Sequence, residues 1–403
     1  MATASASLRR EMRVLSLIST GHFMSHYSQI AIYPLFLLIH EDLGFSYAAL
    51  GLIVTLLNAS GAVAQVPIGF LVDRIGARSL LIGGLFIKTF AIGALALTSS
   101  YEIMLLLAVI AGLGNAVFHP ADYSILMSTV NESRIGRAFS IHTASGSAGS
   151  LIAPIVVVAI ALQWDWRIAL LSVACMGLIT GIAMIFQANA LRDHIAPKQK
   201  KNSSAGTAGI VEGLRMLLAP HVLILYLFFM VTAMISIGLN SFTVTALFKL
   251  HGTPLTLATT ALTTFLLAGL VGVLFGGYLA DKIKRHDLIA VAAFVMSSIA
   301  ILLIGAYDLP LYAMLFCYAV IGLFLGTIRP ARDMMVRAVT KDGDAGKMFG
   351  FMSTGHLLGG VIVPVLFGWL IDQGLVQWVF WLTAIFMGIA ILTLFNPARK
   401  RGV

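Results

Sequence analysis

The sequence has little charge and almost no cysteine. Only 11% of its 403 residues are Asp, Glu, Lys or Arg, whereas 59% are hydrophobic and the mean hydropathy is +0.96. A soluble domain carries about 25% charged residues, so the composition excludes a soluble protein and indicates a polytopic membrane protein. The two cysteines, Cys175 and Cys317, lie far apart in the chain, which excludes a disulfide framework and the paired spacing of a zinc site.

The short motifs of ATP-driven pumps and of hydrolases are also missing. The sequence contains no P-loop lysine motif, no HExxH and no GxSxG. We therefore expect no enzyme activity, with no catalytic residue, no cofactor and no metal site.

Long apolar runs fill most of the chain. About 20 apolar residues suffice to cross the hydrocarbon core of a bilayer, and runs of that length predict an all-α membrane protein with twelve transmembrane helices. We expect these helices near residues 14–39, 47–72, 79–98, 103–128, 137–161, 166–187, 221–248, 256–280, 287–306, 310–337, 347–370 and 376–396.

Basic residues are distributed unevenly between the two ends of these helices. Of 26 Lys and Arg, 21 fall at the N-terminus, in the even-numbered loops or at the C-terminus, which all lie on one side of the membrane. The other side has only Arg167 and Lys249, while Lys88, Arg329 and Arg332 fall within helices. By the positive-inside rule, both termini lie in the cytoplasm of a protein of the inner (plasma) membrane. The rule accounts for the net charge of +9 without a nucleic-acid partner.

A shift of 210 positions superposes two stretches of the chain. Residues 112–122 read GLGNAVFHPAD and residues 322–333 read GLFLGTIRPARD, so that the histidine of the first stretch falls on Arg329 and its aspartate on Arg332. Charged side chains are expensive in lipid, so we expect those of both stretches to face a protein-lined or water-lined interior.

The duplication predicts two pseudo-symmetric six-helix bundles, residues 1–188 and 220–403. Hydropathy collapses between them, where we expect residues 189–219 to form a cytoplasmic linker. Its segment Ile210–Leu218 is amphipathic and is expected to lie on the membrane surface as a short helix.

The first predicted helix carries a polar stripe. His22, His26, Gln29 and Tyr33 follow one another at spacings of four, three and four, which places them on one helical face. Such a face in a membrane helix lines a cavity, although satisfied imidazoles packed against neighbouring helices would give the same pattern.

A second stripe lies in the helix near residues 103–128, where Asn115, His119 and Asp122 are spaced by four and three. Further polar residues fall within apolar helices of both halves. The candidate substrate-binding residues are His22, His26, Gln29, Tyr33, Asn115, His119, His142, Asn240, Arg329 and His356.

Two short basic loops carry a specific resemblance. Residues 69–78, GFLVDRIGAR, and residues 277–285, GYLADKIKR, resemble the signature loop of the major facilitator superfamily, in which an aspartate follows a glycine by four residues. The resemblance implies the major facilitator fold and transport by alternating access. An aspartate in this loop can sit near the N-terminus of a neighbouring helix and hold the cytoplasmic side closed. The gating candidates in these loops are Asp73, Arg74, Arg78 and Asp281.

Within that superfamily, the first half is similar to the fosmidomycin-resistance branch. The segments GHFMSHYSQIAIYPLF, GFSYAALGLI and AVFHPADYSIL carry this similarity. His26 stands where that branch usually has an aspartate, and Ala121 where it has a glutamate. Because these acids are absent, the cation coupling and drug specificity of the branch are not transferred to this chain.

The charged residues favour an anionic substrate. Arg329 and Arg332 can each bind a carboxylate or phosphonate through paired hydrogen bonds, and the histidines can exchange protons near neutral pH. The sequence therefore predicts a monomeric, proton-linked carrier of a small organic anion, with Arg329 as the substrate anchor. Drug efflux is the alternative, and a non-transporting membrane receptor is a remote third possibility. Substrate, protons and lipid are the only partners we expect.

The position of the arginines leaves a second role open. Arg329 lies twenty positions after Leu309, or about 30 Å along a helix, which places it in the cytoplasmic half. Asp122, Arg332 and Asp333 are therefore candidates for a cytoplasmic gate or scaffold. The sequence leaves open whether Lys88 extends to the membrane surface, pairs with an acid or joins the cavity.

Overall fold

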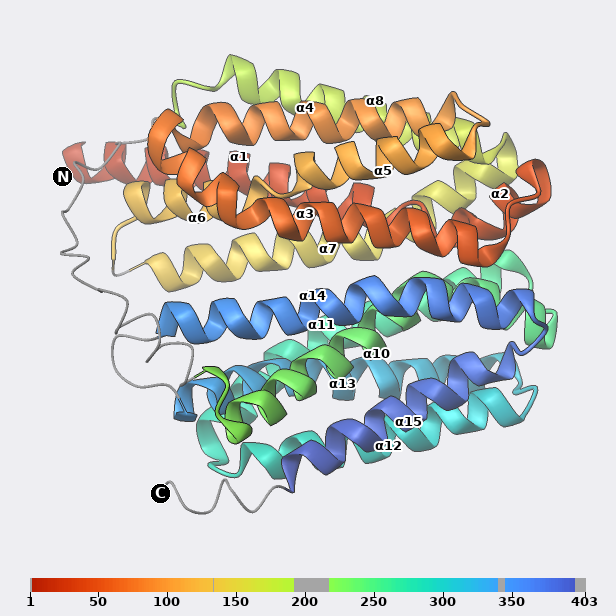
Figure 1. The fold of residues 1–403 in the computed structure, drawn as a ribbon. Helices are drawn as coiled ribbons and strands as arrows, with labels where there is room; N and C mark the ends of the chain where they lie inside the picture. Colours follow the sequence, from red (N-terminus) through yellow and green to blue (C-terminus); the bar gives the residue numbers. More distant parts are fainter. Residues whose placement is uncertain (1, 133, 192–216, 340–344, 396–403) are drawn as a thin grey trace. The chain divides into compact units, whose positions relative to one another are not determined.

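The computed structural model describes residues 2–132, 134–191, 217–339 and 345–395, and these residues contain helices but no strand (Figure 1). The chain divides into two compact units, Met1–Ala196 and Pro197–Val403. Most of the predicted linker, including nearly all of Ile210–Leu218, lies outside the described residues.

The first unit is built from long helices and one 3-10 turn. In chain order these are α1 (Ala2–Ile30), η1 (Tyr33–Leu35), α2 (Phe36–Leu43), α3 (Tyr47–Ile75), α4 (Ala77–Ala96), α5 (Tyr101–Asn115), α6 (Phe118–Thr129), α7 (Ile135–Gln163) and α8 (Trp166–Phe186).

The second unit consists of six long helices among its described residues. They are α10 (Pro220–His251), α11 (Leu255–Lys282), α12 (His286–Ala306), α13 (Leu311–Val339), α14 (Ala345–Asp372) and α15 (Gln377–Leu394). Within the described part of the chain, 11 helical segments are long and apolar enough to cross a membrane.

The predicted helix at 14–39 is wrong as a single element. Helix α1 ends at Ile30, a 3-10 turn follows at Tyr33–Leu35, and α2 starts at Phe36. Pro34 explains the break, because its ring fixes φ, it has no N–H to donate, and it disfavours helical conformation in the residue before it. As a result Tyr33 leaves the predicted polar stripe and is buried in the turn.

The predicted helix at 103–128 is also interrupted. Helix α5 ends at Asn115 and α6 begins at Phe118, which Figure 1 shows as separate ribbons within one apolar span. Pro120 cannot donate a hydrogen bond to the carbonyl of Ala116, so the α-helical ladder fails at this turn. Asn115 therefore belongs to a different helix from the other two residues of its predicted stripe.

The same helix pairings recur in both units. Helix α1 packs on α7, α3 on α5, and α4 on α5 and α8; correspondingly, α10 packs on α14, α11 on α13, and α12 on α13 and α15. Glycines that the 210-residue shift superposes permit equivalent contacts. A Cβ at Gly112 would lie 2.2 Å from the Leu57 carbonyl oxygen, and a Cβ at Gly322 would lie 2.2 Å from that of Phe265. The duplication is thus visible in the packing of each unit.

Candidate functional site

Three buried ionisable side chains of the first unit form what we term the histidine–aspartate cluster: His22 of α1, Asp122 of α6 and His142 of α7. Asp122 Oδ2 lies 2.9 Å from His142 Nε2 and 3.4 Å from His22 Nδ1. The two imidazole rings stack with their centroids 3.8 Å apart. Only 0% of Asp122, 1% of His142 and 4% of His22 is exposed, so the cluster lies inside the helix bundle.

Glycines on α7 allow the cluster to form. A Cβ at Gly146 would lie 2.7 Å from ring atoms of His22 and 2.8 Å from His26 Cδ2, and a Cβ at Gly149 would lie 2.3 Å from the Phe23 carbonyl oxygen. Larger residues at these positions would push α1 away from α7. The glycine-rich stretch of α7 therefore has a direct role in placing the histidines.

Two further histidines flank the cluster. The ring centroid of His22 is 4.7 Å from that of His26 and 5.4 Å from that of His119. His26 is partly exposed and its Nδ1 lies 3.4 Å from Ser150 Oγ, whereas His119 is exposed. The cluster thus lies beneath two more accessible imidazoles.

Several polar atoms of the cluster are unsatisfied. Among the described residues, Asp122 Oδ1, His22 Nδ1 and His142 Nδ1 are buried without a hydrogen-bond partner, since the 3.4 Å contact of His22 Nδ1 with Asp122 Oδ2 is not a hydrogen bond. A buried unpaired polar atom costs about 1–3 kcal/mol, so three at one place favour a site that binds something over a purely structural arrangement.

A second buried group in this unit, the lysine triad, consists of Lys88, Ser25 and Asn115. Lys88 Nζ donates to the Ser25 carbonyl oxygen at 2.5 Å and to Asn115 Oδ1 at 2.8 Å. Asn115 Oδ1 also accepts a hydrogen bond from Ser25 Oγ at 2.8 Å. Only 1% of Lys88 is exposed, and among the described residues it pairs with no carboxylate. Of the three roles that the sequence left open for Lys88, the structure shows it joining the polar interior.

The other predicted residues of the first unit have separate places. Gln29 donates to Asn58 Oδ1 at 2.9 Å and so links α1 to α3. Arg74 is exposed, and Arg78 donates to the Ala188 carbonyl oxygen at 3.4 Å. The side chain of Asp73 lies outside the described residues.

In the second unit, the arginine group comprises Arg329, Arg332 and Asp333 of α13 and His356 of α14. Arg332 Nε donates to Asp333 Oδ1 at 3.2 Å, and the Arg332 guanidinium stacks 4.4 Å above the Phe229 ring. Arg329 is exposed and makes no ion pair or side-chain hydrogen bond with the residues that the structure describes. His356 is also exposed and lies within electrostatic reach of both arginines.

The remaining predictions in this unit concern Asn240 and Asp281. Asn240 is half-buried on α10, and its Oδ1 has no hydrogen-bond partner among the described residues. The side chain of Asp281 lies outside the described set.

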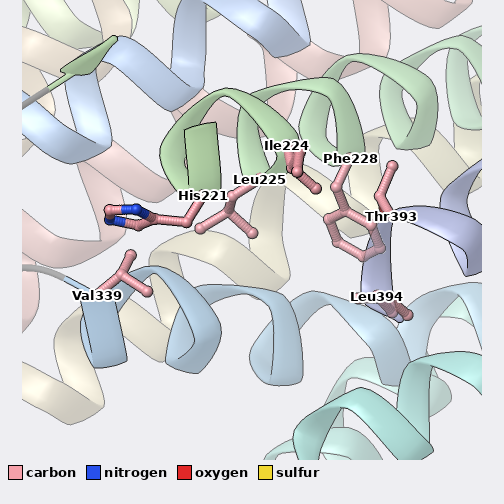
Figure 2. A pocket seen from close by; sticks show the side chains of 7 residues that line it. All are labelled: His221, Ile224, Leu225, Phe228, Val339, Thr393 and Leu394. Atoms are coloured by element: carbon pink, nitrogen blue, oxygen red, sulfur yellow. The ribbon is translucent and has the colours of Figure 1, made fainter. Parts of the chain in front are cut away.

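A pocket in the second unit has a different character. Figure 2 shows its lining, which comes from the ends of α10, α13 and α15 and contains none of the predicted binding residues. Most of these side chains are apolar, so the pocket lacks the charged groups that an ionic substrate requires. The lining residues are His221, Ile224, Leu225, Phe228, Val339, Thr393 and Leu394.

Sequence reasoning missed two contributors to these groups. Ser25 carries no signal beyond its position one residue before His26, and a small residue such as Gly146 in a membrane helix indicates only close helix packing. Lys88 was visible as a charge within a predicted membrane helix, which is a reliable sign of an interior position. Its partners lie on other helices and cannot be identified from spacing along one helix.

Comparison with known proteins agrees with the architecture of both units. The sequence model of the Major Facilitator Superfamily matches residues 18–252 and, in a second match, residues 233–402. A bacterial homologue of the human lysosomal transporter Spinster, crystallised in an inward-facing and unoccupied conformation, superposes with a TM-score of 0.80 at 17% sequence identity. The superposition covers 97% of each chain and confirms the predicted all-α major facilitator fold.

Two proteins of Escherichia coli (strain K12) are similar in sequence. The fosmidomycin resistance protein is 24% identical over 416 residues, covering 99% of this chain and 96% of its own. The membrane sensor protein UhpC is 23% identical over 355 residues, covering 83% of this chain and 79% of its own. The predicted resemblance to the fosmidomycin-resistance branch is thereby confirmed.

Proposed function

Because this chain belongs to the major facilitator superfamily, it is a multi-pass membrane secondary transporter and not an enzyme, and we propose that it carries a small organic anion together with protons. The proposed substrate is of carboxylate or phosphonate type. Transporters built from such repeats bind their substrate near the bilayer midplane and expose it alternately to the two sides. We place both termini in the cytoplasm, as the distribution of basic residues indicates.

The proposal rests chiefly on Arg329. Its guanidinium is permanently charged, lies within a membrane-spanning helix, is exposed, and forms no ion pair with the described residues, since the nearby Asp333 is paired with Arg332. An unpaired charge at such a depth is costly, and positions of this kind usually mark a substrate or ion pathway. A planar guanidinium binds carboxylates and phosphonates through two parallel hydrogen bonds, which supplies the missing counter-charge.

Arg332 is a weaker candidate for the substrate anchor. Its charge is already compensated by Asp333, and its guanidinium is held over Phe229. We propose that Arg332, Asp333 and Asp122 serve conformational change rather than binding of the transported anion. Asp122 is fully buried beside His142 and His22, where it holds α6 and α7 to α1.

His356 offers a route for proton linkage. Its imidazole lies within electrostatic reach of Arg329 and Arg332, so protonation would place a third positive charge beside the first two. A bound anion offsets this repulsion and favours the protonated ring, and a protonated ring in turn favours the bound anion. Reciprocal linkage of this kind makes proton and anion travel together.

Substitution of Arg329 tests the proposal. In proteoliposomes, Arg329→Ala is expected to lower kcat/KM for anion uptake by roughly 10-fold to 100-fold, the value of a charge-assisted hydrogen bond. Arg337→Ala is the matched control, because Arg337 is exposed on the same helix two turns further along and is expected to transport normally. Uptake by Arg329→Ala at the rate of Arg337→Ala would refute the assignment.

Drug efflux is the second candidate, favoured by similarity to a resistance protein over nearly the whole chain. Export of fosmidomycin from cells, abolished by deletion of the gene and indifferent to Arg329→Ala, would support efflux over anion uptake.

A receptor role is the third candidate, since the chain is also similar to a membrane sensor. Tight binding of an anion by the purified protein without any flux across a proteoliposome membrane would favour this role.

A further inference from the structure

We propose that the histidine–aspartate cluster is a binding site for a transition-metal cation of the Zn²⁺ type, with His22, Asp122 and His142 as ligands. Their ligand atoms all lie within 4.8 Å of one another, although the residues come from three different helices. Anion transport through Arg329 does not require such a site, so the inference goes beyond the proposed function.

The distances fit a cation of this kind. Ligands held about 2.0–2.1 Å from a tetrahedral Zn²⁺ lie roughly 3.3 Å from each other. In the cluster, Asp122 Oδ2 is 3.4 Å from His22 Nδ1 and 2.9 Å from His142 Nε2. Both distances from the carboxylate are within about half an ångström of this separation, and all three ligand atoms lie within 4.8 Å of one another.

The donor set indicates which metals would bind. Imidazole nitrogens suit Zn²⁺, Co²⁺, Ni²⁺ and Cu²⁺, whereas Mg²⁺ and Ca²⁺ prefer oxygen ligands throughout. Two imidazoles with one carboxylate leave a fourth tetrahedral position open. His26 and His119 lie beside His22 and provide both a fourth ligand and a path inward, because His119 is exposed and His26 is partly so.

The unsatisfied atoms provide separate support. Without a cation, His22 Nδ1 and Asp122 Oδ1 are buried and lack hydrogen-bond partners among the described residues. A cation bound between the carboxylate and the two rings would coordinate His22 Nδ1 and neutralise the buried Asp122. Burial of a carboxylate is expensive unless it is paired or coordinates a metal.

The positive charge of Lys88 would repel a cation bound in the cluster, so its removal tests whether the bound ion is a cation or an anion. Its ammonium group lies within electrostatic reach of His22 while donating to Ser25 and Asn115. Removal of this positive charge by Lys88→Met is expected to tighten binding of a cation. If the cluster instead binds an anion, the same substitution would weaken binding.

The experiment uses the purified full-length protein with its affinity tag removed and metal stripped by a chelator. Calorimetric titration with Zn²⁺ alone is expected to give one site per chain, and Co²⁺ is expected to show the intense visible absorption of a tetrahedral site. Asp122→Asn and His142→Gln should each weaken Zn²⁺ binding by about 100-fold or more. His221→Gln is the control, because His221 is an exposed histidine of the other unit.

Several outcomes would overturn the inference. These are absence of Zn²⁺ binding to wild type, binding that Asp122→Asn and His142→Gln both leave unchanged, and weaker binding in Lys88→Met. Variants are compared only if they elute as a single symmetric peak and unfold, without metal, in one cooperative thermal transition. Should Asp122→Asn fail this criterion, His142→Gln and the Co²⁺ spectrum of wild type decide the question. Metal binding is measured without an anion, so its failure leaves the proposed function standing.

Discussion

Lys88 shows how a charge is accommodated inside an apolar helix bundle. Its ammonium group is fully buried, yet its described partners are a backbone carbonyl and an amide oxygen rather than a carboxylate. Each of these hydrogen bonds to a charged group contributes about 1.5–3 kcal/mol. The lysine triad therefore depends on both acceptors being present.

Loss of one acceptor should be costly. Asn115→Leu is expected to destabilise the protein by about 1–3 kcal/mol, because it leaves a buried ammonium partly unpaired. The double variant Lys88→Met/Asn115→Leu should lose clearly less stability than the sum of the losses in Lys88→Met and Asn115→Leu alone, because the two residues interact. Thermal unfolding in detergent measures these differences.

The control for this cycle pairs Lys88→Met with Asn58→Leu. Asn58 accepts its hydrogen bond from Gln29 and is not a partner of Lys88, so these two losses should add. Strict additivity in the Asn115 cycle as well would contradict the assigned role of Asn115.

At the scale of elements, glycines determine how closely neighbouring helices approach. A Cβ at Gly112 would lie 2.2 Å from the Leu57 carbonyl oxygen and 2.0 Å from Ser60 Oγ. Any added side chain would therefore force α5 and α3 apart. The structure requires glycine at this position for a packing reason.

Gly112→Ala is therefore expected to lower the melting temperature by several degrees and to reduce transport. Gly83→Ala is the matched control, because nothing lies within 4 Å of a Cβ added at Gly83 of α4. Alanine is favoured over glycine within a helix by about 1 kcal/mol, so this control should melt at or above the wild-type temperature. Equal melting of the two variants would contradict the packing argument.

Hydropathy predicted where the helices lie but not where they break. Ten of the twelve predicted runs correspond to single helices within a few residues at each end, while those containing Pro34 and Pro120 are divided. Pro330 lies inside the continuous helix α13, so proline alone does not decide the outcome. Apolar periodicity reports burial in the membrane, and a short backbone break leaves it unchanged.

The candidate site was predictable only in part, for a similar reason. Spacing along one helix identified His22, His119 and Asp122 as interior residues. It could not reveal that Asp122 contacts His142, because that contact joins α6 to α7. It also grouped Asn115 with His119, although the break before Phe118 places them on different helices.

At the scale of the whole molecule, the two units share one pattern of helix packing but differ in their ionisable residues. The first unit holds buried histidines, an aspartate and a lysine, and the second holds an exposed, unpaired arginine with a neighbouring histidine. The packing of helices is repeated between the units, whereas the ionisable residues at positions matched by the 210-residue shift differ. Function is therefore assigned from these residues and not from the fold that the two units share.

The central claim is that anion and proton move together, and uptake under an imposed pH gradient tests it most directly. Wild-type protein in proteoliposomes is presented with a carboxylate or phosphonate that raises its melting temperature. The account predicts faster uptake when the outside is more acidic than the lumen, and loss of this acceleration when a protonophore is added. A rate of anion uptake that is the same with and without the pH gradient, and that the protonophore does not change, would contradict the account.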